Sequence, residues 1–187
     1  KKNTDGVFSL SLQKYIGTGV SAEIPSSIGE VAVTAIEEKA FYGCGNLCDI
    51  HIPDSVVSIG NNAFTYCTGL TEVSIPDSVT AMGSAFSGCT ALQEVVLPVR
   101  LSTLGEGCFS GCVNLETLKL PASLTEIPDS LFADFTKLTE IIIPEGVTSI
   151  GRWAFAYCIN LTSVVIPKTV KSIGAGAFDH CKSLKEV

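Results

Sequence analysis

The sequence predicts an α/β repeat solenoid, a right-handed superhelix of about seven coils in which short parallel strands alternate with short helical or 3₁₀ turns. Three residue types share one interval of 22 or 23 residues along the 187-residue chain. Independent residue types do not share a period by chance, so the repeat is the main feature of the chain. The three series are Phe41, Phe64, Phe86, Phe109, Phe132, Phe155 and Phe178; Leu47, Leu70, Leu92, Leu115, Leu138, Leu161 and Leu184; and Pro53, Pro76, Pro98, Pro121, Pro144 and Pro167.

Each repeat begins with a short strand. In the fullest copy, residues 164–166 are β-branched and alternate with period two, which predicts a strand. Pro167 closes this strand because proline has no N–H to donate to a sheet. A second extended or turning segment follows and carries Val170 and Ile173.

The rest of the unit forms a corner. Gly174 permits a sharp change of direction, and the spacing of Ala177, Phe178 and Cys181 predicts one or two turns of α- or 3₁₀ helix with these side chains facing inward. One unit cannot bury its own apolar face, so the copies must stack. Each coil then adds a strand to a parallel sheet, at about 4.8 Å per coil.

Two copies depart from the pattern. The third is one residue shorter between Gly83 and Phe86, so its corner should be tighter. The fifth has Pro128 in place of the glycine and Phe135 in place of the cysteine. Because phenylalanine is much larger than cysteine, we expect this coil to bulge or to turn that ring outward, and to be the most irregular.

The first residues do not follow the period. Pro25 lies 28 residues before Pro53, five more than one repeat, and the segment between Ile24 and Val33 looks like a repeat with a small inserted hairpin. A solenoid needs a cap over the exposed end of its core. We therefore assign residues 1–22 to an N-terminal cap or hairpin and residues 23–187 to the solenoid, with the last coil truncated.

Charge and hydropathy exclude some classes of partner. The formal net charge is −7, whereas nucleic-acid binding needs clustered lysine and arginine. We expect no nucleic-acid partner. No run of 18 apolar residues is present, so we expect no transmembrane segment in this chain.

Six of the eight cysteines occupy one position of the repeat, and only Cys48 and Cys108 fall outside it. A ladder of small buried side chains is the favoured interpretation, and a ladder does not converge on a tetrahedral metal site. A local disulfide remains open for Cys44 with Cys48 and for Cys108 with Cys112, since each pair is four residues apart.

The sequence lacks the motifs of several common enzyme classes. His51 and His180 lie in distant coils and cannot build a histidine-based triad or zinc site. The chain also lacks glycine-rich phosphate loops and the nucleophile elbow. We therefore expect no enzyme activity, no metal and no cofactor.

Outward positions of the first strand vary between copies, and a ligand site must be sought there. They form two rows on one sheet face, one mostly acidic and the other with an apolar end, which is a plausible protein-binding surface; a merely solvated face is the alternative. A second, lower-ranked surface is the corner that carries Tyr42, Tyr66, Trp153 and Tyr157. The candidate ligand-binding residues are Asp49 and His51, Glu72 and Ser74, Glu94 and Val96, Thr117 and Lys119, Glu140 and Ile142, and Ser163 and Val165.

The repeat resembles the BspA-like, or Treponema pallidum-type, class of leucine-rich repeats. Residues 144–164 carry its whole string, with Pro, Val, Ile, Gly, Ala, Phe, Cys, Leu and Val at the family's spacing, and the resemblance extends over roughly residues 22–187. It implies a leucine-rich-repeat superhelix from a bacterial or protist surface protein.

The resemblance also implies a function. It points to a non-catalytic, cell-surface or secreted module for protein binding or adhesion. The partner would be a protein or glycan, such as a host matrix protein or another microbe, met at an extracellular or cell-surface location. The alternative is a structural stalk or spacer that presents other modules and has no ligand of its own.

Overall fold

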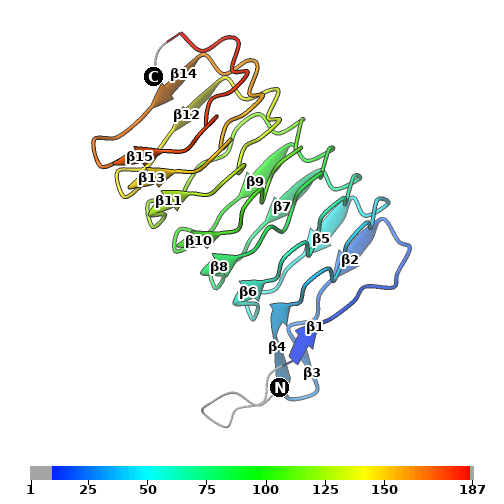
Figure 1. Ribbon diagram of the computed structural model, residues 1–187. Helices are drawn as coiled ribbons and strands as arrows, with labels where there is room; N and C mark the ends of the chain where they lie inside the picture. The colour runs from blue at the N-terminus through cyan, green and yellow to red at the C-terminus, as the bar shows by residue number, and fades with distance from the viewer. Residues whose placement is uncertain (1–9, 186–187) are drawn as a thin grey trace.

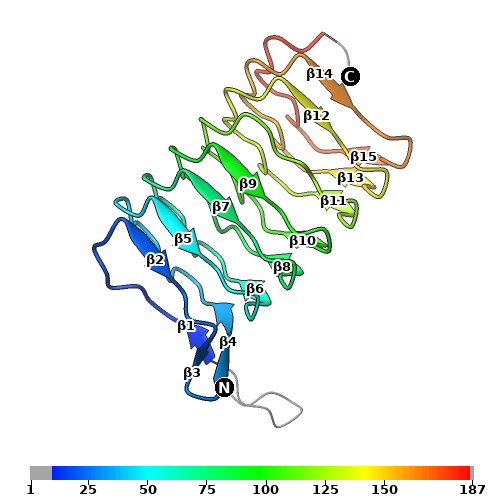
Figure 2. The ribbon, with the colours of Figure 1, turned by 180° about the vertical axis from the view of Figure 1, so that it is seen from behind.

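The computed structural model describes residues 10–185, which form a rod of about seven stacked coils (Figures 1 and 2). Each regular coil contributes one strand to each of two columns. The first column holds β2 (Ser21–Glu23), β5 (Asp49–His51), β7 (Glu72–Ser74), β9 (Glu94–Val96), β12 (Glu140–Ile142) and β14 (Ser163–Val165). The second holds β1 (Leu10–Leu12), β4 (Val31–Ile36), β6 (Ser58–Ile59), β8 (Ala81–Met82), β10 (Thr103–Leu104), β11 (Glu126–Ile127), β13 (Ser149–Ile150) and β15 (Ser172–Ile173).

The pairing within both columns is parallel, as the repeat predicts, but neither column is continuous. The second column divides into a sheet that ends with β10 and a three-stranded sheet of β11, β13 and β15. The first column divides into the pairs β2–β5, β7–β9 and β12–β14. The strand expected over residues 117–119 is not formed.

The proline between the two columns builds a turn. Its carbonyl accepts a hydrogen bond from the N–H three residues later, as when Val56 donates to Pro53 at 3.0 Å. The same bond recurs at every proline of the series, including Leu124 to Pro121 at 3.2 Å. Proline therefore ends the first strand and positions the buried aliphatic side chain of the turn.

The glycine after the second strand is needed for close contact between coils, not for the sharp corner predicted from the sequence. The N–H of Gly60 donates to the carbonyl of Ile36 in the preceding coil at 2.8 Å. A Cβ at Gly60 would lie 2.7 Å from the backbone nitrogen of Glu38. No side chain fits between backbones at this distance.

The prediction of helical or 3₁₀ turns at the corners is wrong, because the structure contains no helix within residues 10–185. Two residues of each regular corner have left-handed backbone conformation, as Asn62 (φ 57°) and Tyr66 (φ 60°) do in the second. This alternation turns every second N–H toward the next coil, as when Phe64 donates to Ala85 at 2.8 Å. The corners are therefore a third hydrogen-bonded side of the solenoid.

The shortened third corner is tighter, as predicted. Ala85 donates to Gly83, two residues back, at 2.8 Å, whereas the equivalent Ala63 donates to Gly60, three residues back, at 3.3 Å. One residue fewer therefore closes the turn with a smaller hydrogen-bonded ring.

The repeated apolar residues fill the interior, and the phenylalanine rings stack from coil to coil. Phe41 and Phe64 stack at 5.0 Å between ring centroids, and so do Phe64 and Phe86. The stack stops after Phe109 and resumes with Phe132 and Phe155 at 4.9 Å.

The interruption lies in the fifth copy, which the sequence predicts to be the most irregular, but the predicted outward turn of the Phe135 ring is wrong. Phe135 is 0% exposed and packs edge-on against Phe132, with ring centroids 5.3 Å apart. Burial removes a large apolar surface from water, which outweighs the gain from regular stacking. The fifth copy therefore interrupts the ring stack and the strand columns, but the Phe135 ring remains in the core.

At the N-terminal end, Tyr15 takes the place of a phenylalanine and stacks on Phe41 at 5.0 Å. The predicted insert is present as β3 (Ser27–Ile28), which pairs antiparallel with the start of β4. Residues 1–9 of the predicted cap lie outside the described residues. The assignment of the cap to residues 1–22 stays a prediction.

Candidate functional site

The candidate site is the outer surface of the first strand column, which we call the strand face. The central residue of each strand points inward and is buried, as with Ile50, Val73 and Val164. The residues on either side of it are exposed in all six coils from β5 to β14, including the unpaired segment 117–119. The twelve residues predicted from the sequence therefore share one solvent-facing surface.

The strand register arranges these residues in two rows. Glu72 lies opposite Glu94, and Ser74 lies opposite Val96. The rows extend one strand further than predicted, because Ser21 and Glu23 of β2 pair with the two ends of β5. These two residues could not be predicted from the repeat, because the inserted hairpin displaces β2 from its period.

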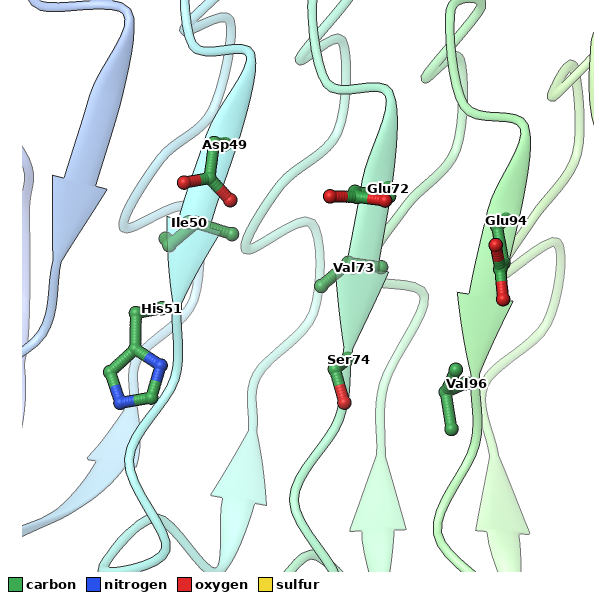
Figure 3. A pocket seen from close by; sticks show the side chains of 8 residues that line it. All are labelled: Asp49, Ile50, His51, Glu72, Val73, Ser74, Glu94 and Val96. Atoms are coloured by element: carbon green, nitrogen blue, oxygen red, sulfur yellow. The ribbon is translucent and has the colours of Figure 1, made fainter.

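The acidic part of the strand face forms a shallow pocket of about 400 Å³ over β5, β7 and β9. Figure 3 shows Asp49, Glu72 and Glu94 at one level of the three strands, with His51, Ser74 and Val96 along the other row. Among residues 10–185, none of these carboxylates is in an ion pair. The same described residues contain no group of three potential metal ligands.

The other end of the strand face is apolar. Ile142 and Val165 lie opposite each other in β12 and β14 and are 74% and 59% exposed. Lys119 is exposed in the coil before them. The face thus carries most of its carboxylates near the N-terminus and its most exposed apolar side chains near the C-terminus.

The two histidines lie far apart, as predicted. His51 is in β5, whereas His180 is in the last corner, where its ring stacks on Tyr157 at 4.5 Å and its Nδ1 lies 3.0 Å from Oδ1 of Asp179. The contacts of His180 are thus local to its corner.

The lower-ranked aromatic surface at the corners is divided. The rings of Tyr42 and Tyr66 meet edge-on, with centroids 5.6 Å apart. The stacked pair of Tyr157 and His180 lies several coils away from them. Trp153 packs over Gly176, where a Cβ would lie 2.6 Å from the indole ring. These aromatic groups cover neighbouring backbone and do not form one continuous patch.

All eight cysteines are free thiols. Cys108 and Cys112 are both buried, and neither this pair nor the pair of Cys44 with the exposed Cys48 is bridged. Burial raises the pKa of the Cys67, Cys108 and Cys112 thiols to about 12, so these groups stay protonated. A protonated, enclosed thiol is a poor nucleophile and a poor metal ligand.

Within residues 10–185, the structure has no helix with the length and apolar character needed to cross a membrane.

Comparison with known proteins supports the repeat assignment. A model of the BspA type leucine-rich repeat region matches six copies, over residues 34–85 and 82–185. The crystal structure of the T. pallidum leucine-rich repeat protein is 33% identical and superposes with a TM-score of 0.93, covering 100% of this chain and 87% of that one. No curated protein matches at a significant level.

Two further solved structures share the fold. A leucine-rich repeat protein from Bacteroides ovatus is 28% identical with a TM-score of 0.68, and the match covers 92% of this chain and 52% of that one. The present chain therefore spans about half the length of that protein. The pneumococcal vaccine antigen PcpA is 16% identical with a TM-score of 0.57, covering 95% of this chain and 62% of that one, which shows the fold alone.

Proposed function

The chain belongs to the BspA-type leucine-rich repeat family, and on that premise we propose that it is a non-catalytic module that binds a protein partner on its strand face. Leucine-rich repeat domains generally mediate protein interactions, and family members are generally not enzymes. The observation that carries the proposal is the arrangement of the twelve exposed residues in two rows on one face.

The strand face suits a macromolecular partner for two reasons. Its side chains project from strands whose inward residues are locked in the core, so that little backbone freedom is lost on binding. Its acidic part offers Asp49, Glu72 and Glu94, which form no ion pair within residues 10–185, and its apolar part offers Ile142 and Val165. A partner with a basic patch beside an apolar patch would match both parts.

We place this interaction on the cell surface or outside the cell, where adhesion to host matrix proteins or to other microbes would take place. The family assignment supports this location. Labelling of intact source cells with antibodies against the chain, compared with labelling of permeabilised cells, tests it. Labelling only after permeabilisation would contradict it.

The binding proposal is tested by charge reversal. Immobilised host matrix proteins, such as fibronectin and fibrinogen, are probed with the purified chain and with the triple variant Glu72→Lys, Glu94→Lys and Glu140→Lys. These side chains are exposed, so the free energy of unfolding of the variant should stay within about 0.5 kcal/mol of that of the original chain. Its affinity for the matrix protein should fall by about tenfold or more.

The matched control reverses three exposed carboxylates outside the strand face, Glu106, Glu126 and Glu145, and should keep the original affinity. If both triple variants lose the same amount of affinity for the matrix protein, the effect comes from net charge alone. The assignment of binding to the strand face is then wrong. If the unmodified chain binds no matrix protein at micromolar concentration, the stalk without a ligand of its own becomes the better description.

A further inference from the structure

The first strand column is interrupted at residues 116–120, between β9 and β12. Within the described chain, the backbone of this segment makes no hydrogen bond to either neighbouring coil. The equivalent segments elsewhere are bonded, as when Ile75 donates to Val96 at 3.0 Å or Thr162 to Thr139 at 2.9 Å. One stretch of extended backbone thus has both edges unpaired in the middle of the strand face.

The segment nevertheless keeps the side-chain pattern of a strand. Leu118 and Leu120 are buried, whereas Thr117 and Lys119 are exposed. In an extended chain with this alternation, the N–H and C=O groups point sideways, toward the positions of the neighbouring strands. The buried leucines therefore hold the backbone in place with its hydrogen-bonding groups directed toward the gaps.

The fifth copy, to which residues 116–120 belong, departs from the repeat at two positions. Pro128 cannot donate the inter-coil hydrogen bond that Gly105 and Gly151 donate to the coils before them, both at 2.8 Å. The Phe135 ring fills the position of a much smaller cysteine beside Phe132. Both residues oppose regular stacking of this coil, and the segment 116–120 belongs to the same coil.

The gap on each side of the segment is a groove. The larger, of about 770 Å³, lies between β9 and residues 116–122 and has apolar walls that include Val96, Leu97, Val99 and Leu120. The smaller, of about 470 Å³, lies between the segment and β12. Glu94 also lines the larger groove, and no ion pair within the described chain engages it. Apolar walls, unpaired backbone and a free carboxylate therefore meet in one place.

We propose that the groove between β9 and residues 116–122 binds an extended peptide segment of a protein partner. The peptide main chain hydrogen-bonds the free edge of residues 117–120, its apolar side chains contact Val96 and Val99, and a basic side chain faces Glu94. Strand addition of this kind takes affinity from main-chain bonds and specificity from alternate side chains. The inference rests on the proposed function and assigns the form of the bound partner.

The test uses the whole chain and random dodecapeptides displayed on phage, since the natural partner is not needed. Selected peptides are synthesised and titrated by calorimetry, and amide hydrogen exchange is followed with and without peptide. We expect selected sequences that combine apolar residues with lysine or arginine. In the free protein, the amides of residues 117–120 should exchange faster than those of residues 94–96, and bound peptide should slow them.

Matched substitutions locate the peptide. Val99→Asp, in the groove wall, should weaken peptide binding by about tenfold or more, whereas Val57→Asp, at an exposed site outside both the groove and the strand face, should leave it unchanged. Methylation of the peptide backbone nitrogens should also abolish binding, because it removes the main-chain donors. Both valines are exposed, so the two variants should fold normally.

Three results would overturn the inference: no selected peptide binds, the bound peptides leave residues 117–120 unprotected, or Val99→Asp and Val57→Asp weaken peptide binding equally. Protection of residues 117–120 by self-association at high protein concentration would instead identify a second copy of the chain as the occupant. Because Glu94 lines this groove, the single variant Glu72→Lys, and not the triple variant, reports on the strand face outside it. Matrix binding that depends on Glu72 without peptide binding would thus reject the groove and retain the proposed function.

Discussion

The thiol of Cys67 donates a hydrogen bond of 3.1 Å to the backbone carbonyl oxygen of Phe41, one coil earlier. That carbonyl also accepts the N–H of Cys44 at 3.1 Å, so the thiol uses a second acceptor position that no backbone group reaches. The same contact recurs along the row, for Cys89 with Phe64, Cys112 with Phe86, Cys158 with Phe132 and Cys181 with Phe155. Cysteine therefore combines a small volume with a donor that links adjacent coils.

Thiol accessibility follows from this arrangement. In the folded protein, we expect Cys67, Cys89, Cys112 and Cys158 to resist maleimide labelling, because all four are buried, while the exposed Cys48 reacts at once. All eight should react after unfolding without reductant. Mass spectrometry of the labelled chain counts the sites, and a mass two hydrogens lower per pair before labelling would reveal disulfides that contradict this prediction.

Alkaline pH should destabilise the protein through the same thiols. Burial raises the pKa of Cys108 from 9.0 to about 12 in the folded state. Above pH 9 the unfolded chain therefore binds fewer protons than the folded one, and the free energy of unfolding falls with rising pH up to about pH 12. The fall is about 1.4 kcal/mol per pH unit for each such thiol.

The variant Cys108→Ala isolates one of these contributions. Alanine occupies the same repeat position in other coils, as Ala63, Ala85 and Ala154 do, so this variant should fold normally. Urea titrations at pH 8 to 10.5 should show that its stability declines less steeply than that of the original chain. Parallel curves would mean that the Cys108 thiol ionises equally in both states.

The phenylalanine stack should contribute unequally along the rod. Phe64 is fully buried and stacks on both sides, with Phe41 and Phe86. Phe64→Ala should lower the free energy of unfolding by about 3–5 kcal/mol, because it leaves a large cavity between two coils. Phe178 is half-buried and, among the described residues, stacks only on Phe155, so Phe178→Ala should lower the free energy of unfolding by roughly half as much. Equal losses in denaturant titrations would contradict a cooperative ring stack.

The repeat made most of this architecture predictable, because stacked copies place each residue type against its own kind. The inward Phe, Leu and Ile rows and the outward positions of β5 to β14 follow directly from the period. Tyr15, Ser21 and Glu23 could not be assigned in this way, because the hairpin between β3 and β4 displaces them from it.

The corners and the interrupted strand escaped prediction for other reasons. Apolar residues at helical spacing suggested a helix, but Asn62 and Tyr66 adopt positive φ because coil-to-coil hydrogen bonds offset the cost of that conformation, about 1–2 kcal/mol per residue. The interruption at residues 116–120 lies in the same coil as the buried Phe135 ring, whose direction is a packing outcome. Its signal in the sequence was the pair of departures at positions 128 and 135.

Phe135→Cys restores the residue that six other copies carry at this position, and replacement by a consensus residue commonly stabilises a protein. Here we expect the free energy of unfolding to fall by about 2–4 kcal/mol. The new thiol could donate to the carbonyl of Phe109, a gain of about 1 kcal/mol, whereas removal of a ring that is 0% exposed and packed edge-on against Phe132 leaves a cavity.

Two measurements decide how the fifth coil responds to Phe135→Cys. Urea titration gives the change in stability, and amide exchange at residues 117–119 reports whether the interrupted strand pairs with its neighbours. We expect the stability to fall and the amides of residues 117–119 to keep exchanging fast, because Pro128 still has no N–H to donate to the preceding coil. Higher stability together with slowed exchange would contradict this, and would show that the Phe135 ring alone keeps the fifth coil from stacking like the others.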